Sequence, residues 1–291
     1  MKPASFEYVR PGSLDEALDV LHERGDDAKV LAGGQSLVPM MNFRLARPAV
    51  LVDLNGLGDL AYIRPANGGL ALGAMTRQRT IEKSAVVRER APLLAEATPL
   101  IGHVPIRTRG TIGGSLVHAD PAAEYPVVMV ALDAEFTLAR KGGTRRVAAA
   151  DFFDTYLSTT IGPDEILTEI RMPSVAPRAA VAFVEISRRH GDFALVAAGT
   201  VVDVDGGGRI AEARIALGGV GPRPVRARTA ERMLVGQRPT AALLAEAAAS
   251  VMPDTDPPED IHASAEYRRE MSAVFTRRAL TAALAKLGVQ L

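Results

Sequence analysis

The sequence predicts an α+β protein in two parts, and the order of its strand-like and helix-like segments is the main reason. Short strands and helices alternate through residues 1–175. After a proline-bounded stretch at 173–177 (PSVAP), three strand-like segments come first and three helix-like segments follow. This order is typical of a sheet that packs against helices. We therefore predict an N-terminal domain at 1–175 and a C-terminal domain at 178–291 with a three-stranded antiparallel sheet and helices.

The individual elements follow from capping residues, turns and periodicity. Ser13 and Glu16 have the spacing of a capping box, so a helix is expected to begin at Leu14 and to end at Gly25. The turn Asn67-Gly68-Gly69 predicts a hairpin, and Asp120-Pro121 predicts the start of another helix. Further strands are expected at 29–32, 50–54, 62–63, 70–72, 135–139, 165–172, 180–187, 194–203 and 210–217. Further helices are expected within 76–101 and at 229–234, 240–251 and 265–287.

Composition excludes several classes of protein. The formal net charge is zero, which argues against nucleic acid or an anionic membrane as a partner. No apolar run approaches the roughly 20 residues of a membrane span, and the N-terminal residues show no secretory signal, so a cytoplasmic location is expected. The chain has no cysteine, and its five histidines show no paired spacing of metal ligands. We therefore expect no metal site in this chain.

Two glycine-rich segments about eighty residues apart are the most informative feature. One is residues 31–37 (LAGGQSL) and the other is residues 111–116 (TIGGSL). Paired glycines in a tight turn allow backbone N–H groups to converge on an oxyanion, and two such turns could hold a pyrophosphate from both sides. Paired glycines are also common in ordinary turns, and neither segment is a dinucleotide fingerprint or a P-loop. The residues alone leave a phosphate site and two ordinary turns equally open.

Longer stretches around these glycines resemble a known family. Residues 31–48 (LAGGQSLVPMMNFRLARP), 106–126 (IRTRGTIGGSLVHADPAAEYP) and 187–196 (SRRHGDFALV) are similar, in order and spacing, to signature segments of the FAD-binding subunits of molybdenum hydroxylases. Carbon monoxide dehydrogenase medium subunits and xanthine dehydrogenase flavin domains belong to this family. The resemblance implies a two-part FAD-binding domain of the PCMH type, with parts at about 1–55 and 56–175, followed by the family's C-terminal domain.

The resemblance also implies which residues contact a non-covalently bound FAD. The first segment would wrap the diphosphate, the second would contact the diphosphate and ribityl chain from the opposite side, and two apolar residues would line the cofactor. Glu124 would approach the ribityl hydroxyls, and Phe193 would cover one face of the isoalloxazine ring, although a core phenylalanine is the alternative. The remaining implied residues are Ala32, Gly33, Gly34, Gln35, Ser36, Thr111, Gly113, Gly114, Ser115, Ile101 and Leu167.

One departure from the family's pattern concerns the strand before Phe193. Many relatives carry a lysine at or next to the position where this chain has Val184-Glu185. A cationic contact to the flavin from this strand is therefore not expected. His118 lies three residues after Ser115, and a contact with the cofactor is the less favoured interpretation of it.

The implied function is that of one subunit in a larger enzyme. A large subunit would hold the molybdenum cofactor, a small subunit would hold 2Fe–2S clusters, and this oxidoreductase subunit would pass electrons through FAD to an external acceptor. Two alternatives are a stand-alone FAD-dependent oxidase, for which we find no substrate-site motif, and a non-catalytic flavin-binding scaffold. The sequence identifies neither the hydroxylated substrate nor the final acceptor.

Overall fold

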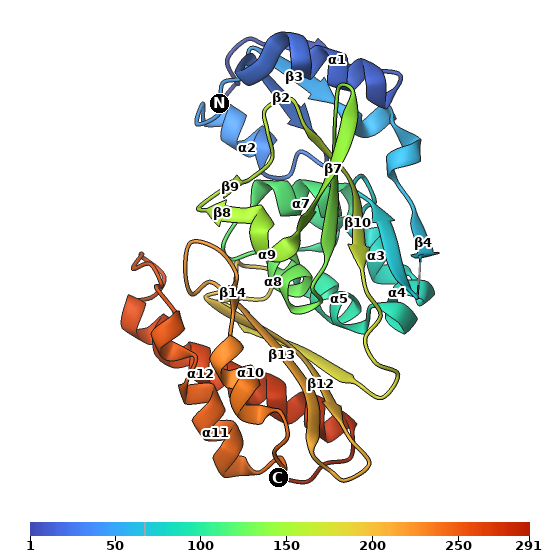
Figure 1. The fold of residues 1–291 in the computed structure, drawn as a ribbon. Helices are drawn as coiled ribbons and strands as arrows, with labels where there is room; N and C mark the ends of the chain where they lie inside the picture. The colour runs from blue at the N-terminus through green and yellow to red at the C-terminus, as the bar shows by residue number, and fades with distance from the viewer. Residues whose placement is uncertain (67) are drawn as a thin grey trace.

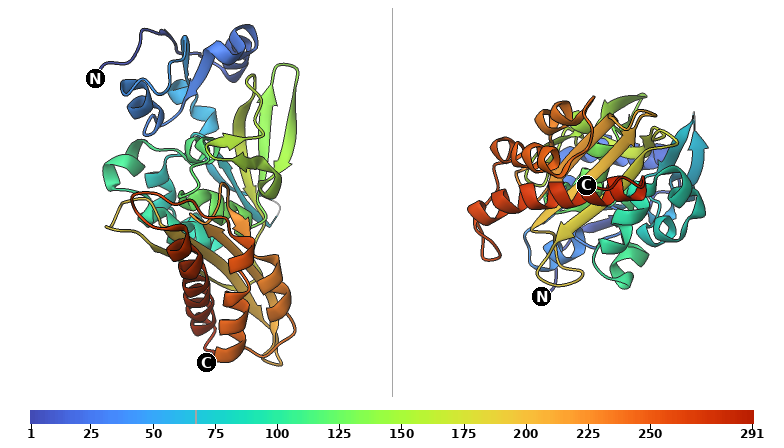
Figure 2. Two further views of the ribbon diagram at one scale, coloured as in Figure 1. Left: turned by 90° about the vertical axis from the view of Figure 1, so that its left-hand side faces the viewer. Right: turned by 90° about the horizontal axis from the view of Figure 1, so that it is seen from below.

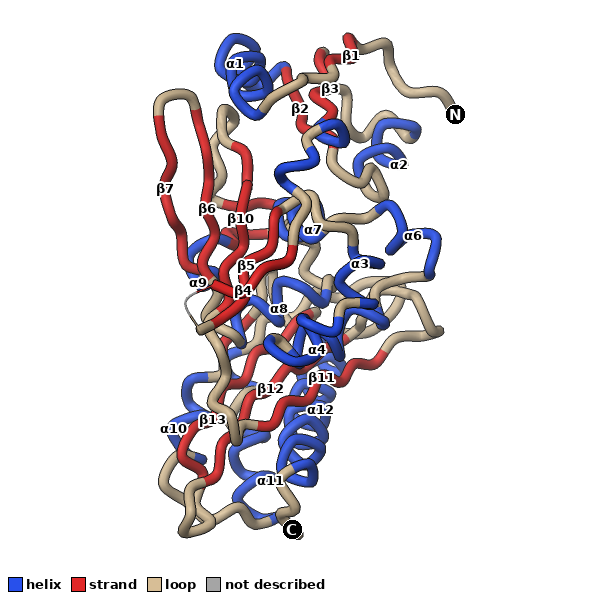
Figure 3. The backbone as a smooth tube through the Cα atoms, turned by 90° about the vertical axis from the view of Figure 1, so that its right-hand side faces the viewer, coloured by secondary structure: helices blue, strands red, loops and turns tan. Residues whose placement is uncertain are grey.

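Three main sheets follow one another along the molecule. The computed structural model describes residues 1–66 and 68–291, so Asn67 of the predicted hairpin turn lies outside the described residues. Figure 1 shows the N-terminal sheet at the top, a larger sheet in the middle and the C-terminal sheet below. The side views in Figures 2 and 3 show the same order. The fold is therefore mixed α and β, as predicted.

The N-terminal sheet is small and parallel. Its elements are β1 (Glu7–Val9), α1 (Leu14–Arg24), β2 (Ala28–Leu31), α2 (Leu37–Asn42) and β3 (Val50–Asp53), followed by the 3₁₀ turns η2 (Leu54–Gly56) and η3 (Gly58–Leu60). The strand order is β1-β3-β2. Ser13 caps α1 by accepting a hydrogen bond from the N–H of Glu16 (3.2 Å), and Gly25 ends the helix, as predicted. Leu18 and Leu21 of α1 pack with Val52 of β3 in one buried cluster.

The middle sheet is antiparallel and carries most of the helices. Its strands, in the order β4-β5-β10-β6-β7, are β4 (Ile63–Ala66), β5 (Gly69–Gly73), β10 (Ile166–Met172), β6 (Glu135–Arg140) and β7 (Gly143–Ala148). The helices are α3 (Gln78–Lys83), α4 (Ala85–Arg90), α5 (Pro92–Ala97), α6 (Val104–Arg109), α7 (Ile112–His118), α8 (Glu124–Ala131) and α9 (Ala149–Phe152). A two-stranded ribbon follows, β8 (Phe153–Thr155) and β9 (Ser158–Thr159). Every residue of α8 is buried, so this helix is the centre of the core.

The C-terminal sheet lies between helices of its own domain and helices of the middle region. Its elements are β11 (Ala180–Ile186), β12 (Val196–Val204), β13 (Ile210–Gly218), β14 (Val225–Arg226), α10 (Arg228–Leu234), α11 (Ala241–Ala249) and α12 (Ala265–Lys286). Because side chains alternate across a strand, Val181 and Phe183 join the core around α8, whereas Ala180 and Ala182 join the cluster under α12. Figure 2 shows α12 lying across this sheet.

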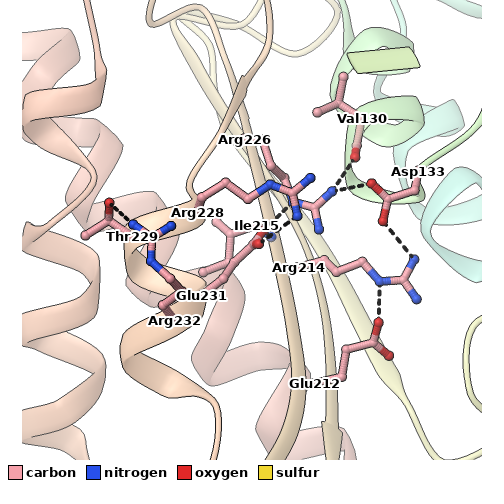
Figure 4. Close-up of polar contacts among 10 residues, drawn as sticks. All are labelled: Val130, Asp133, Glu212, Arg214, Ile215, Arg226, Arg228, Thr229, Glu231 and Arg232. Carbon is pink, nitrogen blue, oxygen red and sulfur yellow. Dashed lines mark hydrogen bonds and ion pairs between the residues drawn. The ribbon is translucent and has the colours of Figure 1, made fainter. Parts of the chain in front are cut away.

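An ion-pair network joins the C-terminal sheet to the middle core (Figure 4). Arg226 of β14 donates to the carbonyl of Val130 (2.9 Å) near the end of α8 and to Asp133 (2.7 Å) just after it. It also bonds the carboxylate of Glu231 in α10. Glu231 in turn accepts the N–H of Ile215 (2.8 Å). Each buried charge here therefore has a partner of opposite sign, which offsets the cost of removing it from water.

The structure differs from the sequence-based expectations at several elements. Strands β1 and β7 were not predicted, because β1 has three residues and β7 carries polar, largely exposed side chains without a buried alternation. Helix α8 begins at Glu124 and not at Asp120, because Asp120 forms a turn that bonds the N–H of Ala122 (2.9 Å). The C-terminal sheet has a two-residue fourth strand, β14, beside the three predicted strands. The division into 1–55, 56–175 and 178–291 stays a prediction.

Candidate functional site

The first glycine segment forms the connection between β2 and α2. Gly34 has φ +71°, a left-handed conformation that glycine adopts readily. From Gly33 to Leu37, no backbone N–H group has a hydrogen-bond partner among the described residues. All five residues are partly exposed, so their N–H groups can bond either water or a ligand with acceptor oxygens.

Two side-chain amides set the orientation of this segment. Asn55 donates from Nδ2 to the carbonyl of Ala32 (2.9 Å), and Gln35 donates from Nε2 to the carbonyl of Gly33 (3.0 Å). In a planar trans peptide, the carbonyl of one residue and the N–H of the next point in opposite directions. The two amides therefore turn the N–H groups of Gly33 and Gly34 away from Asn55 and Gln35. The side chain of Gln35 therefore bonds the backbone of its own segment.

The second glycine segment is different from its predicted form, because its glycines lie in the first turn of α7. Thr111 caps this helix, and its Oγ1 accepts the N–H of Gly114 (3.0 Å). The N–H of Ile112 donates to Thr76 (3.1 Å), that of Gly113 to Ala74 (2.8 Å) and that of Ser115 to Thr111 (3.2 Å). All four donors are thus used within the protein. A Cβ on Gly113 would lie 2.6 Å from that of Ala74, so this glycine is required for packing.

The two glycine segments meet in space, as the sequence suggested. A Cβ added at Gly33 would lie 2.5 Å from the carbonyl oxygen of Arg109 and 2.7 Å from Cα of Gly110. A Cβ added at Gly114 would lie 3.4 Å from that of Ala32. Only glycine permits this approach at Gly33. The residues present fit a diphosphate, since a row of unpaired donors lies beside a second glycine segment.

The apolar residues implied to line the cofactor lie in the central core. Ile101 follows the 3₁₀ turn η4 (Thr98–Leu100), and Leu167 lies in β10. They are 8% and 4% exposed and belong to the same buried cluster as Leu116 of α7. They therefore belong to the buried core and not to the surface.

Two carboxyl groups are buried near each other between α8 and β11. Glu124 is the first residue of α8 and is 6% exposed, and Oε2 of Glu185 is buried with no hydrogen-bond partner among the described residues. Burial, together with the smaller effect of the nearby charge of Glu185, raises the pKa of Glu124 to about 8. Burial raises the pKa of Glu185 to about 7. Sequence reasoning identified Glu124 but treated Glu185 only as a departure.

The loop between β11 and β12 presents Phe193 to solvent. Its side chain is 69% exposed, which excludes the alternative that Phe193 is a core residue. The loop is held near Ile101: the rings of His103 and His190 stack with their centres 6.0 Å apart, and Gly191 lies directly against His103. The histidine pair was missed because its members lie 87 positions apart and share no motif. His118 is half-buried in α7, and burial lowers its pKa.

Residues 1–66 and 68–291 hold neither a cluster of metal-ligand side chains nor a helix suited to crossing a bilayer. No group of three or more histidine, aspartate or glutamate side chains in these residues is placed to hold a metal ion. Among the same residues, no helix combines the length and the apolar character that crossing a bilayer requires.

Comparison with known proteins gives consistent matches over nearly the whole chain. Residues 4–175 match the family described as FAD binding domain in molybdopterin dehydrogenase, and residues 181–283 match CO dehydrogenase flavoprotein C-terminal domain. The 6-hydroxypseudooxynicotine dehydrogenase complex subunit alpha of Paenarthrobacter nicotinovorans is 41% identical, over 98% of this chain and 96% of the relative. The caffeine dehydrogenase subunit beta of Pseudomonas sp. (strain CBB1) is 39% identical, over 97% and 96%.

Solved structures agree with these sequence matches. Carbon monoxide dehydrogenase from Hydrogenophaga pseudoflava gives a TM-score of 0.95 at 38% identity, covering 98% of this chain and 99% of that chain. Quinoline 2-oxidoreductase from Pseudomonas putida 86 gives a TM-score of 0.94 at 36% identity, covering 99% of both chains.

Proposed function

Because the chain belongs to the family of FAD-binding medium subunits of molybdenum hydroxylases, we propose that it transfers electrons from a partner subunit to an external acceptor. The chain is an oxidoreductase subunit with an FAD-binding domain. In the proposed complex, a large subunit holds the molybdenum cofactor and a small subunit holds 2Fe–2S clusters. This chain has no cysteine and so offers no thiolate ligands for such clusters. The proposal places the complex in the cytoplasm.

The observation that carries this proposal is the row of unpaired N–H donors from Gly33 to Leu37. We assign the diphosphate of FAD to these donors, with Ala32 and Ser36 at the edges of the contact. Thr111, Gly113, Gly114 and Ser115 provide the opposing wall, and the close approach at Gly33 keeps this wall next to the donors. A diphosphate carries the acceptor oxygens and the negative charge that converging backbone dipoles favour.

The other residues would act along the rest of the cofactor. Bound FAD accepts and releases electrons singly or in pairs, which suits a link between metal clusters and an acceptor. Ile101 and Leu167 would exclude water from the buried side. Glu124 would accept hydrogen bonds from ribityl hydroxyls, and its raised pKa means that it holds a proton over part of the neutral range. Phe193 would cover the solvent side of the ring.

The test is to reduce the flavin through the partner proteins. The chain would be purified with the two proteins that co-purify with it, and flavin absorbance would be followed without oxygen after the iron–sulfur subunit is reduced. We expect the flavin to be reduced in the complex but not in the chain alone. A flavin that stays oxidised would support the scaffold alternative. Reduction of the isolated chain by an alcohol would support the oxidase alternative.

A further inference from the structure

The segment after β5 lies alongside the second glycine segment. The N–H of Ile112 donates to the carbonyl of Thr76 (3.1 Å), and the N–H of Gln78 donates to the carbonyl of Gly110 (2.9 Å). Between these bonds, Arg77 and Thr111 form an isolated antiparallel bridge. These backbone bonds alone therefore hold Arg77 beside the turn that carries Thr111, independently of its side chain.

The side chain of Arg77 connects this turn to the first glycine segment. Its Nη2 donates to Oδ1 of Asn55 (2.6 Å), and its Nη1 donates to the carbonyl of Arg109. Asn55 is the residue that holds the carbonyl of Ala32, and the carbonyl of Arg109 is the atom closest to a Cβ placed on Gly33. One guanidinium thus bonds the groups that position both segments.

The charge of Arg77 has no carboxylate partner within 4.0 Å among the described residues. Other arginines that are mostly buried are paired: Arg107 with Glu82, and Arg226 with Glu231. Arg77 is only partly exposed, and burial lowers its pKa, with repulsion from Arg109 as the second cause. Asp53 attracts this charge from a distance, but the direct bonds of the guanidinium are all to neutral oxygens, so an anion could still form an ion pair with it.

We propose that Arg77 is a positioning residue for the FAD diphosphate: it holds the two glycine segments against each other, and the diphosphate supplies a negative charge next to a guanidinium that forms no direct ion pair among the described residues. This inference rests on the proposed function, in which FAD binds at the first segment. Arginine suits the role because its planar fork bonds two acceptors in different directions, whereas a lysine ammonium would keep the charge without the two-point bridge.

The test compares three variants of the full-length apo chain by FAD titration at several salt concentrations. We expect Arg77→Met to raise the dissociation constant for FAD about 10- to 100-fold, as for loss of hydrogen bonds from one ionised group. The salt dependence of binding should also become weaker, because a charge that attracts the diphosphate is gone. Arg77→Lys should weaken binding less and keep the salt dependence. Arg79→Met is the control, since Arg79 lies two residues further along, in α3, and pairs with Glu82 (2.7 Å).

A structural role alone would give a different result. If Arg77 only stabilised the fold, Arg77→Met would lower the melting temperature of the apo chain and leave the FAD affinity and salt dependence of the folded protein unchanged, which would overturn the proposal. Should Arg77→Met not fold, Arg77→Lys decides, and wild-type affinity in that variant would also overturn it. A wild-type chain that does not bind FAD would instead contradict the proposed function itself.

Discussion

The two glycine segments look alike in the sequence but differ in what their backbones do. From Gly33 to Leu37 the N–H groups have no partner among the described residues, whereas those from Ile112 to Ser115 are all bonded within the protein. In the first segment glycine permits a left-handed turn, and in the second it permits helix α7 to contact Ala74. The same residue pair therefore leaves N–H donors unpaired in one place, where we propose that the diphosphate binds, and has all its N–H donors bonded within the protein in the other.

Charged side chains also divide into those with a partner within the protein and those without one. Arg226 and Glu231 are buried and fully partnered, which is expected of a network that joins two layers of the fold. Glu185 has a buried oxygen without a partner, and Arg77 has no carboxylate. Arg77 lies beside the two glycine segments and Glu185 lies in β11, and perturbed charged groups of this kind are enriched at functional sites. Buried side-chain atoms without a partner also occur elsewhere among the described residues, at Thr200, Arg268 and Thr276.

The largest expected effect comes from adding a side chain in the packing segment. In Gly113→Ala the new Cβ would lie 2.6 Å from Cβ of Ala74 and 2.7 Å from its carbonyl oxygen. Overpacking of this kind costs about 1–3 kcal/mol or more. We expect chemical denaturation to show a lower free energy of unfolding in the apo chain. If Gly113→Ala were as stable as the wild type, the packing role of this segment would be wrong.

A matched change in the first segment should act mainly on the cofactor. Gly34→Val forces a branched residue into a left-handed conformation, at a cost of roughly 1–2 kcal/mol, and displaces the neighbouring N–H groups. Loss of several charge-assisted hydrogen bonds predicts an FAD affinity about 100-fold weaker in folded protein. Isothermal titration at a temperature where both proteins are folded measures this. Wild-type affinity in Gly34→Val would remove the distinction between the segments.

The buried carboxyl pair makes the apo chain less stable as the pH rises. The folded-state pKa values of Glu124 and Glu185 lie above the usual value of 4.5, so the folded state binds protons more tightly than the unfolded state. Their contribution is complete at acidic pH and is lost as the pH rises toward about 8. We expect the free energy of unfolding to fall by about 1–3 kcal/mol between pH 6 and pH 9.

The variant Glu124→Gln should remove most of that pH dependence, because it leaves one carboxyl and no repulsion between two. Glu89→Gln serves as the control, since the side chain of Glu89 is 73% exposed. An unchanged slope in Glu124→Gln, measured by urea denaturation across this pH range, would show that the pair does not titrate in this range.

The smallest effect on stability is expected for Phe193→Ala. The ring is 69% exposed, so its removal should cost well below the roughly 3–5 kcal/mol of a buried phenylalanine. The flavin should nevertheless be reoxidised faster by oxygen after reduction, because one face is opened to solvent. A large loss of stability together with unchanged reoxidation would contradict the role assigned to Phe193.

Local signals in the sequence predicted much of the fold. The cap at Ser13, the strands at 180–187 and 210–217 and the long C-terminal helix depend on short-range patterns, and each is present in the structure. Strand β7 has no such pattern, because its side chains are largely exposed, and it pairs with β6 at the edge of the sheet. Whether the N–H groups of the glycine segments form hydrogen bonds also depends on residues that are distant in the sequence.

The same limit applies to the candidate site. The glycine segments and Glu124 could be named from motifs that the family shares. Arg77 belongs to none of the recognised motifs, and its contacts with Asn55 and Arg109 are separated by 22 and 32 positions. The stacking of His103 on His190 is equally non-local. Contacts of this kind can be identified only from the folded structure.

Amide-resolved hydrogen exchange of the full-length chain, with and without FAD, tests the distinction between the two segments most directly. Unpaired N–H groups exchange quickly, and bonded ones exchange slowly. We predict that FAD slows exchange strongly at residues 33–37 and changes it little at residues 112–115, which are already protected. Unchanged exchange at 33–37 on saturation with FAD, or equal protection of both segments, would contradict the account.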